Sequence, residues 1–124
     1  MKGLHHIEIY TSDLNRSIIF WDWLLKELGY TDHQRWESGK SWKVEDTYIV
    51  FVQTEQNHLS VPYHRKRTGL NHLAFHVESP AKLAQFKEEL AKRGICLLYP
   101  EKKLRPNVLY FEDPDRIKVE LVVP

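Results

Sequence analysis

Two histidines at matching positions of an internal repeat are the residues of this sequence best suited to chemistry. Residues 6–12 alternate polar and apolar side chains as a half-buried strand does, and a similar run, residues 72–78, follows about 66 positions later. His6 and His72 open these two runs, and the last predicted strand adds a carboxylate, Glu120. Imidazole and carboxylate groups from distant strands are typical metal ligands. The sequence therefore predicts a metal site made of these three side chains.

Each run leads into a predicted amphipathic helix. We expect the first helix at about 13–28, where apolar residues recur every three or four positions, and a glycine, Gly29, follows it as a C-cap. The second is expected at about 80–93, because Pro80 suits the first helical position and Gly94 suits the C-cap. The two halves of the chain therefore share one plan.

Strands are predicted on both sides of each helix, which gives the order βαβββ twice. A βα start followed by hairpins does not produce a doubly wound parallel sheet, so we expect an α+β fold with a curved mixed sheet. The stretch 30–53 is strand-like with turn signals, and the clearest predicted strands lie at 5–11, 47–53, 69–77, 95–99, 108–111 and 117–123.

Composition narrows the class of function. The net charge of +1 gives no reason to expect nucleic acid, and no stretch approaches the roughly 20 apolar residues that cross a membrane. The single cysteine, Cys96, and the lack of an apolar signal segment favour a cytoplasmic protein. As partners we expect a small-molecule substrate and neither nucleic acid nor membrane. We interpret the short basic cluster at 64–67 as a solvated linker in preference to an anion site.

Three segments carry a resemblance to a known family. They are LHHIEIYTSDLNRS (residues 4–17), GLNHLAFHV (69–77) and EDPDRIKVEL (112–121). Together they resemble the vicinal oxygen chelate superfamily, which includes glyoxalase I, fosfomycin resistance proteins, extradiol dioxygenases and methylmalonyl-CoA epimerase. The resemblance covers essentially the whole chain.

The resemblance implies a single glyoxalase-like domain whose paired βαβββ modules form a cup around a divalent metal. Module one spans about 4–54, the linker about 55–69 and module two about 70–124. In such proteins the ligands come from the first and last strands of each module. Some related proteins complete the cup within one chain and others between two chains, and we expect a homodimer.

Carried over by position, the resemblance makes His6, His72 and Glu120 the metal ligands. The fourth position of this pattern falls on Phe51, with Gln53 one step later on the same face. A phenylalanine cannot bind a metal, so the chain is similar to the three-ligand dioxygenases and fosfomycin proteins unless Gln53 substitutes. The ligand set leaves Mn, Fe, Zn and Ni open.

Strand alternation adds candidates on the same faces as the predicted ligands. Glu8 and His76 are candidate catalytic groups for proton transfer, and the alternative for each is a sheet residue that hydrogen-bonds to a neighbour. Tyr10 can hydrogen-bond an anionic substrate. The predicted substrate-binding residues are Tyr10, Phe51 and Gln53.

The leading hypothesis is a small metal-dependent enzyme of the glyoxalase or dioxygenase type: a lyase, an isomerase or a dioxygenase. It acts on a small oxygenated metabolite that chelates the metal through adjacent oxygens. One alternative is a metal-independent binding module of the bleomycin resistance type. Another is a transferase of the fosfomycin type.

Overall fold

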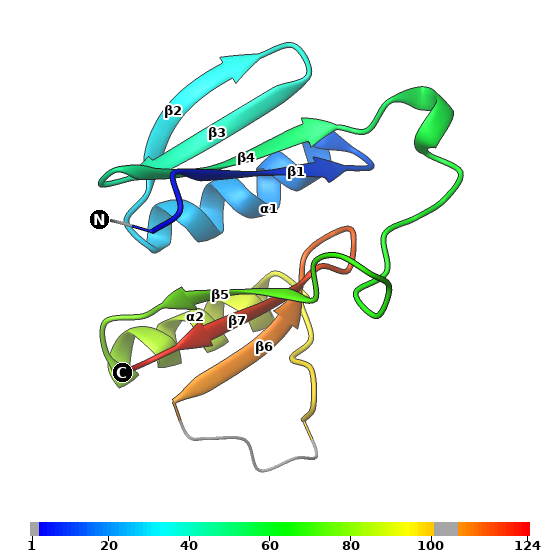
Figure 1. Cartoon of the computed structure of the whole chain (residues 1–124). Helices are drawn as coiled ribbons and strands as arrows, with labels where there is room; N and C mark the ends of the chain where they lie inside the picture. The colour runs from blue at the N-terminus through cyan, green and yellow to red at the C-terminus, as the bar shows by residue number, and fades with distance from the viewer. Residues whose placement is uncertain (1–2, 101–106) are drawn as a thin grey trace. The chain divides into compact units, whose positions relative to one another are not determined.

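The chain is described by a computed structural model that covers residues 3–100 and 107–124. Contacts between Cα atoms divide the chain into two compact units, residues 1–62 and 63–124. The boundary falls inside the predicted linker. Over its described residues, each unit holds a mixed β-sheet with an α-helix beside it (Figure 1). The predicted α+β class with mixed sheets is confirmed.

The first unit contains a four-stranded sheet with the strand order β1-β4-β3-β2. Strand β1 pairs in parallel with β4, whereas β2–β3 and β3–β4 are antiparallel hairpins. A short 3₁₀ helix follows the last strand. The elements are β1 (His6–Thr11), α1 (Leu14–Glu27), β2 (Thr31–Trp36), β3 (Gly39–Val44), β4 (Thr47–Gln53) and η1 (Gln56–His58).

Helix α1 begins and ends where the sequence predicts. The Asp13 carboxylate accepts the N–H of Arg16 at 3.2 Å, which satisfies one of the unpaired donors of the first turn. After the helix, Gly29 takes a left-handed backbone with φ 95°. The apolar face packs on the sheet, where the fully buried Trp21 stacks on Phe51 with ring centroids 4.7 Å apart.

The second unit repeats this plan with a three-stranded sheet of order β5-β7-β6. Strand β5 (His72–His76) pairs in parallel with β7 (Lys118–Val122), and β6 (Val108–Glu112) pairs antiparallel with β7. Helix α2 (Pro80–Lys92) has the predicted start, with the Ser79 hydroxyl accepting the Lys82 N–H at 3.1 Å. The parallel pairing of first and last strands therefore occurs in both units.

The strand predicted at 95–99 is wrong. Residues 95–99 form no strand: the Leu98 N–H donates to the Tyr110 carbonyl at 2.8 Å, whereas the Ile95 N–H donates back to the Leu90 carbonyl of α2 at 2.9 Å. Tyr99 has a φ of 59°, a left-handed conformation that turns the chain out of an extended ladder. The apolar character of this segment therefore reflects packing beside β6 without regular pairing.

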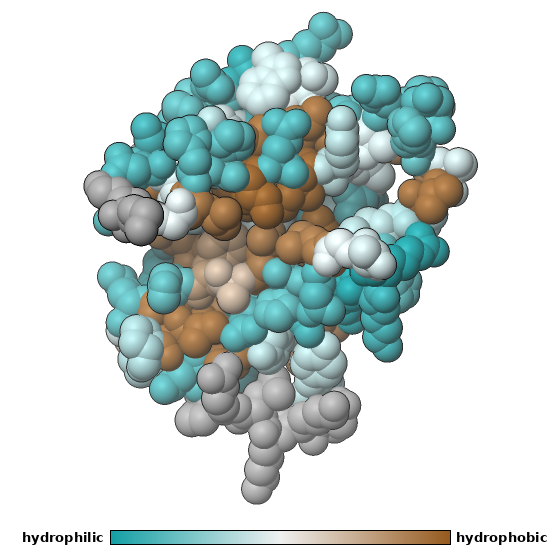
Figure 2. Space-filling model, in the orientation of Figure 1, coloured by the Kyte–Doolittle hydropathy of each residue, from teal (hydrophilic) through white to brown (hydrophobic). Residues whose placement is uncertain are grey.

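Polar residues cover the free edge of the first sheet. Strand β2 is the edge strand, and all of its residues are exposed. Figure 2 shows hydrophilic side chains over the hairpin of β2 and β3 in this view. A polar edge discourages uncontrolled pairing with other strands. Neither α-helix of the described ranges has the length and apolar character needed to span a membrane.

Candidate metal centre

Two rows of polar side chains cross one face of the second sheet. In the first row His72 on β5 pairs in register with Lys118 on β7, which pairs with Glu112 on β6. In the next row on the same face, Glu120 lies between Ala74 and Tyr110. Because side chains alternate along a strand, both rows point away from the core side of the sheet, to which the fully buried Val119 and Phe111 belong.

His72 and Glu120 meet on this face. The Nε2 atom of His72 lies 3.1 Å from Oε1 of Glu120, and their side chains are 34% and 10% exposed. A carboxylate this deeply buried is costly unless it has a partner or a cation. The close approach of His72 and the buried Glu120 therefore identifies a candidate site on the second sheet.

Asn71 sets the tautomer of the His72 ring. The Asn71 amide donates through Nδ2 to the Arg65 carbonyl at 3.2 Å, which leaves its Oδ1 facing His72 Nδ1 at 2.7 Å. An amide oxygen can only accept, so Nδ1 of His72 carries the hydrogen. The neutral ring then presents the lone pair of Nε2 toward Glu120, whose ionised carboxylate is also only an acceptor. Two facing acceptors need a cation, either a proton or a metal ion, to bind them together.

The residues present therefore fit a divalent metal. A histidine whose second ring nitrogen donates to an oxygen is the usual arrangement of metal-binding imidazole. One imidazole and one carboxylate suit manganese, iron, zinc or nickel. His72 and Glu120 are the part of the predicted ligand set that the second unit supplies.

His6 belongs to the first unit. Its ring stacks on Tyr48 with centroids 4.6 Å apart and planes 2° from parallel, and its Nδ1 lies 2.8 Å from Nδ1 of His5. Within residues 3–100 and 107–124, no three His, Cys, Asp or Glu side chains form a group that could hold a metal ion. The convergence of His6 with His72 and Glu120 on one ion stays a prediction.

The residue of the first unit that matches Glu120 in register is Val50, not Phe51. In the first unit Glu8, two residues after His6, pairs with Val50, as Ala74, two residues after His72, pairs with Glu120. The alignment that placed Phe51 opposite Glu120 was therefore wrong by one residue, because the turn before β4 is shorter than the turn before β7 by three residues and not by two. Valine binds no metal either, so a three-ligand site stays the prediction.

Phe51 and Gln53 lie on the other face of β4. Register groups them with Ile9 and Thr11, on the side covered by α1, and the expectation that they share the ligand-facing side is wrong. Phe51 is fully buried. Oε1 of Gln53 accepts the Leu14 N–H at 2.8 Å, and Nε2 donates to backbone carbonyls of its neighbours.

The remaining candidates are exposed. Glu8 and Tyr10 share the face of His6, and His76 shares the face of His72, as alternation predicts. Tyr10 is 58% exposed and therefore accessible to a substrate. Among the described residues neither Glu8 nor His76 forms an ion pair or side-chain hydrogen bond. The alternative, that each is a sheet residue hydrogen-bonded to a neighbour, therefore gains no support.

Sequence reasoning missed a polar cluster beside the ligand pair. The Lys118 ammonium donates to the Tyr99 hydroxyl at 3.2 Å and lies 5.2 Å from the centre of the Tyr110 ring. The hydrogen bond from Lys118 lowers the pKa of the Tyr99 phenol against a smaller opposing effect of burial. Alternation within β7 puts Lys118 on the face of Glu120, but Tyr99 lies in a segment that the sequence predicts to be a strand.

A family model supports the class of protein. The model for the Glyoxalase/Bleomycin resistance protein/Dioxygenase superfamily matches residues 5–107. This match spans most of the chain, which therefore belongs to that superfamily. The resemblance drawn from the sequence motifs is confirmed.

Individual relatives agree with this membership. The uncharacterized protein YqjT of Bacillus subtilis strain 168 is 49% identical over 126 residues, covering 98% of each chain. The glutathione transferase FosA of Serratia marcescens is 29% identical over 99% of this chain and 82% of its own length. A crystal structure from Bacillus halodurans, provisionally described as a glyoxalase, has a TM-score of 0.94 at 50% identity over 98% of this chain and 96% of that chain.

Proposed function

We propose that this protein is a metal-dependent enzyme whose substrate, a small oxygenated metabolite, chelates a divalent ion held by His6, His72 and Glu120. The observation that carries the proposal is the 3.1 Å approach of His72 Nε2 to Glu120 Oε1, with Asn71 fixing the other ring nitrogen. Membership in the superfamily supports it, because the superfamily includes enzymes of this kind. Three protein ligands leave coordination positions open, as a catalytic metal requires.

Side chains on the ligand-bearing faces have distinct roles in this proposal. A bound divalent ion supplies Lewis acidity to the substrate oxygens. Lys118, held by the Tyr99 hydroxyl, supplies a positive charge two residues from Glu120 for an anionic substrate oxygen. Tyr10 donates a hydrogen bond to the substrate, while Glu8 and His76, both exposed, move protons. Phe51 and Gln53 lie on the opposite face of β4, where they contact α1 and stabilise the first unit.

A second candidate is a transferase that joins glutathione to a small substrate. The similarity to the glutathione transferase FosA, over 99% of this chain and 82% of that protein, is the observation that favours it. Both candidates use the same metal ligands, so metal binding tests what they share and turnover separates them. Ligand binding that needs no metal and leads to no turnover would contradict both candidates.

Metal binding is tested by titrating EDTA-treated protein with Mn²⁺ and following the free-ion signal by electron paramagnetic resonance. Wild type should bind one ion per chain. His72→Ala and Glu120→Gln should each weaken binding by more than about 100-fold, since even the loss of an outer partner costs about 10- to 100-fold. His58→Ala, which removes an exposed histidine of η1, is the matched control and should bind as wild type does. Equal binding by all four proteins would overturn the site.

Turnover is tested with the loaded protein and four substrate types. These are hemithioacetals of glutathione, catechols, acyl-CoA epimers, and fosfomycin with glutathione. Turnover of any of the first three that disappears in Glu120→Gln supports the leading proposal, and turnover of the last supports the transferase. Tight binding of a ligand by EDTA-treated protein, without turnover, supports the binding module.

The proposed homodimer has a separate test. If His6 of one chain completes the site of another, a mixture of His6→Ala and His72→Ala proteins, refolded together, contains dimers with one intact site. Such a mixture should recover metal binding that neither variant shows alone. A site formed within one chain predicts no recovery, and sedimentation of wild type reports the assembly directly.

A further inference from the structure

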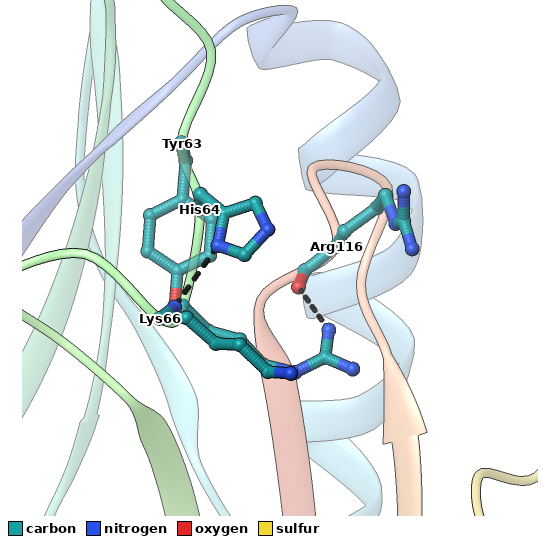
Figure 3. A pocket seen from close by; sticks show the side chains of 5 residues that line it. Tyr63, His64, Lys66 and Arg116 are labelled. Carbon is teal, nitrogen blue, oxygen red and sulfur yellow. Dashed lines mark hydrogen bonds between the residues drawn. The ribbon is translucent and has the colours of Figure 1, made fainter.

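We propose that the second unit contains a binding pocket for a phosphate-type dianion, separate from the candidate metal ligands. The pocket has a volume of about 210 Å³ and is lined by Tyr63, His64, Arg65, Lys66 and Arg116 (Figure 3). The first four residues form the loop before β5, and Arg116 lies in the turn before β7. Four of the five side chains are basic, and His64, Lys66 and Arg116 are exposed, so the pocket opens to solvent.

The loop is held in shape by its own hydrogen bonds. The Tyr63 hydroxyl donates to the Leu70 carbonyl at 2.7 Å, and the Arg67 N–H donates to the His64 carbonyl at 3.1 Å. Burial raises the pKa of the Tyr63 phenol, so it stays a neutral donor at pH 7. The basic side chains are thus presented by an ordered turn, which reduces the entropy lost when a ligand binds.

His64 is oriented to donate into the pocket region. Its Nδ1 accepts the Lys66 N–H at 3.0 Å, as the dashed line in Figure 3 shows. A neutral ring that accepts at Nδ1 carries its hydrogen on Nε2. His64 therefore offers a hydrogen-bond donor at Nε2 among the residues that line the pocket.

Two carboxylates balance part of this positive charge, because Glu112 pairs with Arg65 and the charge of Asp113 acts on Tyr63. Arg65 donates to Glu112 at 2.5 Å and to the Arg116 carbonyl at 3.4 Å, which ties the loop to the turn before β7. The same Glu112 oxygen lies 3.5 Å from Nε of Arg116, so two guanidinium groups share it. Over the described residues, no carboxylate pairs with the Lys66 ammonium, and the pocket keeps excess positive charge.

The chemistry and size of the pocket select a small dianion. Guanidinium and ammonium donors match phosphate oxygens in geometry and charge. The volume corresponds to about seven waters at about 30 Å³ each, enough for one phosphate group and a small attached fragment. A drug-sized ligand needs about 300 Å³ or more. Residues 64, 66 and 67 are exposed, as the linker interpretation expects, and the proposal adds an anion-binding role to this segment.

The test measures inorganic phosphate binding to EDTA-treated protein by calorimetry and ³¹P line broadening, so that no metal mediates it. Wild type should bind one phosphate per chain. Lys66→Gln and Arg116→Asn should each weaken binding about tenfold or more, since each removes a charge-assisted hydrogen bond. Asparagine is chosen at 116 because it tolerates the left-handed φ of 67° there.

Controls separate this site from general charge and from the metal site. Lys87→Gln, an exposed lysine of α2, changes net charge equally and should bind as wild type does. Glu120→Gln should also bind phosphate normally, whatever its effect on metal. Glycerol phosphate as a second probe distinguishes the source: a tighter ester indicates the end group of a metabolite, and tighter inorganic phosphate indicates the free ion. Absence of saturable binding, or equal weakening in Lys87→Gln, overturns the proposal.

Discussion

The Asn71 amide oxygen lies 2.7 Å from Nδ1 of His72 and so turns the opposite nitrogen of the ring toward Glu120. Two adjacent residues of the chain thus determine which lone pair the imidazole presents. The arrangement needs no long-range contact, because Asn71 precedes the first residue of β5. It makes Asn71 a positioning residue for the candidate metal centre.

We predict that Asn71→Ala lowers metal affinity by about 10- to 100-fold, the usual cost of losing an outer partner of a metal ligand. Asn71→Asp keeps an oxygen for His72 but loses the bond to the Arg65 carbonyl, so it should retain most of the affinity. Manganese titration of both variants gives the comparison. Asn15→Ala, on the exposed side of α1, is the control, and equal affinity of Asn71→Ala and wild type would contradict the assigned role.

Truncation of Phe51 should lower the stability of the fold and leave substrate affinity unchanged. Its side chain is fully buried and stacks on Trp21, so Phe51→Ala should cost about 3–5 kcal/mol of unfolding free energy. Urea denaturation measures this difference. Val61→Ala, at a residue 70% exposed, should lie within about 0.5 kcal/mol of wild type. A stable Phe51→Ala protein with altered substrate affinity would restore the earlier substrate-binding interpretation.

Much of the fold was predictable because local signals agreed with the final structure. Both helices have an N-cap residue and a C-terminal glycine, and their ends were predicted to within one or two residues. The shared face of His72 and His76 follows from alternation within one strand. These features depend on neighbouring residues in the chain.

The errors arose where long-range pairing decides the outcome. Whether Val50 or Phe51 matches Glu120 depends on the register of β1 with β4, and a shift of one residue reverses the face. The segment around Tyr99 has strand-like composition, but its left-handed backbone prevents a regular ladder. Asn71 was passed over because its importance lies in one hydrogen bond that no periodicity reveals.

Gln53, like Phe51, should contribute to the stability of the fold and not to substrate binding. Its Oε1 accepts the first N–H of α1, at Leu14, and its Nε2 donates to the Ser12 carbonyl, each at 2.8 Å. Gln53→Ala leaves these backbone groups without this partner and should cost about 1–2 kcal/mol, because the site is part-buried. Thermal unfolding measures it. Gln53→Glu keeps the acceptor and should be intermediate; tighter metal binding by that variant would instead indicate a fourth ligand.

Acid should weaken the first unit through Asp22. Its carboxylate accepts from Nε1 of the buried Trp42 at 2.9 Å and lies 3.1 Å from the Lys26 ammonium. Burial acts to raise the pKa of Asp22, but the hydrogen bonds from Trp42 and Lys26 outweigh it, and the pKa is lowered. A lowered folded-state pKa stabilises the fold fully above the unfolded value of about 3.9, and this stability is lost as pH falls through the folded-state pKa.

We therefore predict that Asp22→Asn, which keeps an oxygen for Trp42 but removes the charge, is less stable than wild type at pH 7 by no more than about 1 kcal/mol, because the side chain is a third exposed. The difference should persist down to about pH 4 and vanish at lower pH, where wild type also loses the charge. Urea denaturation from pH 7 to pH 2 measures it. Glu55→Gln removes an equal charge from a side chain that makes no capping hydrogen bond. The difference in stability between Glu55→Gln and wild type should therefore not change between pH 7 and pH 2. A difference between wild type and Asp22→Asn that stays constant across the whole range would mean that packing, and not the charge, is responsible.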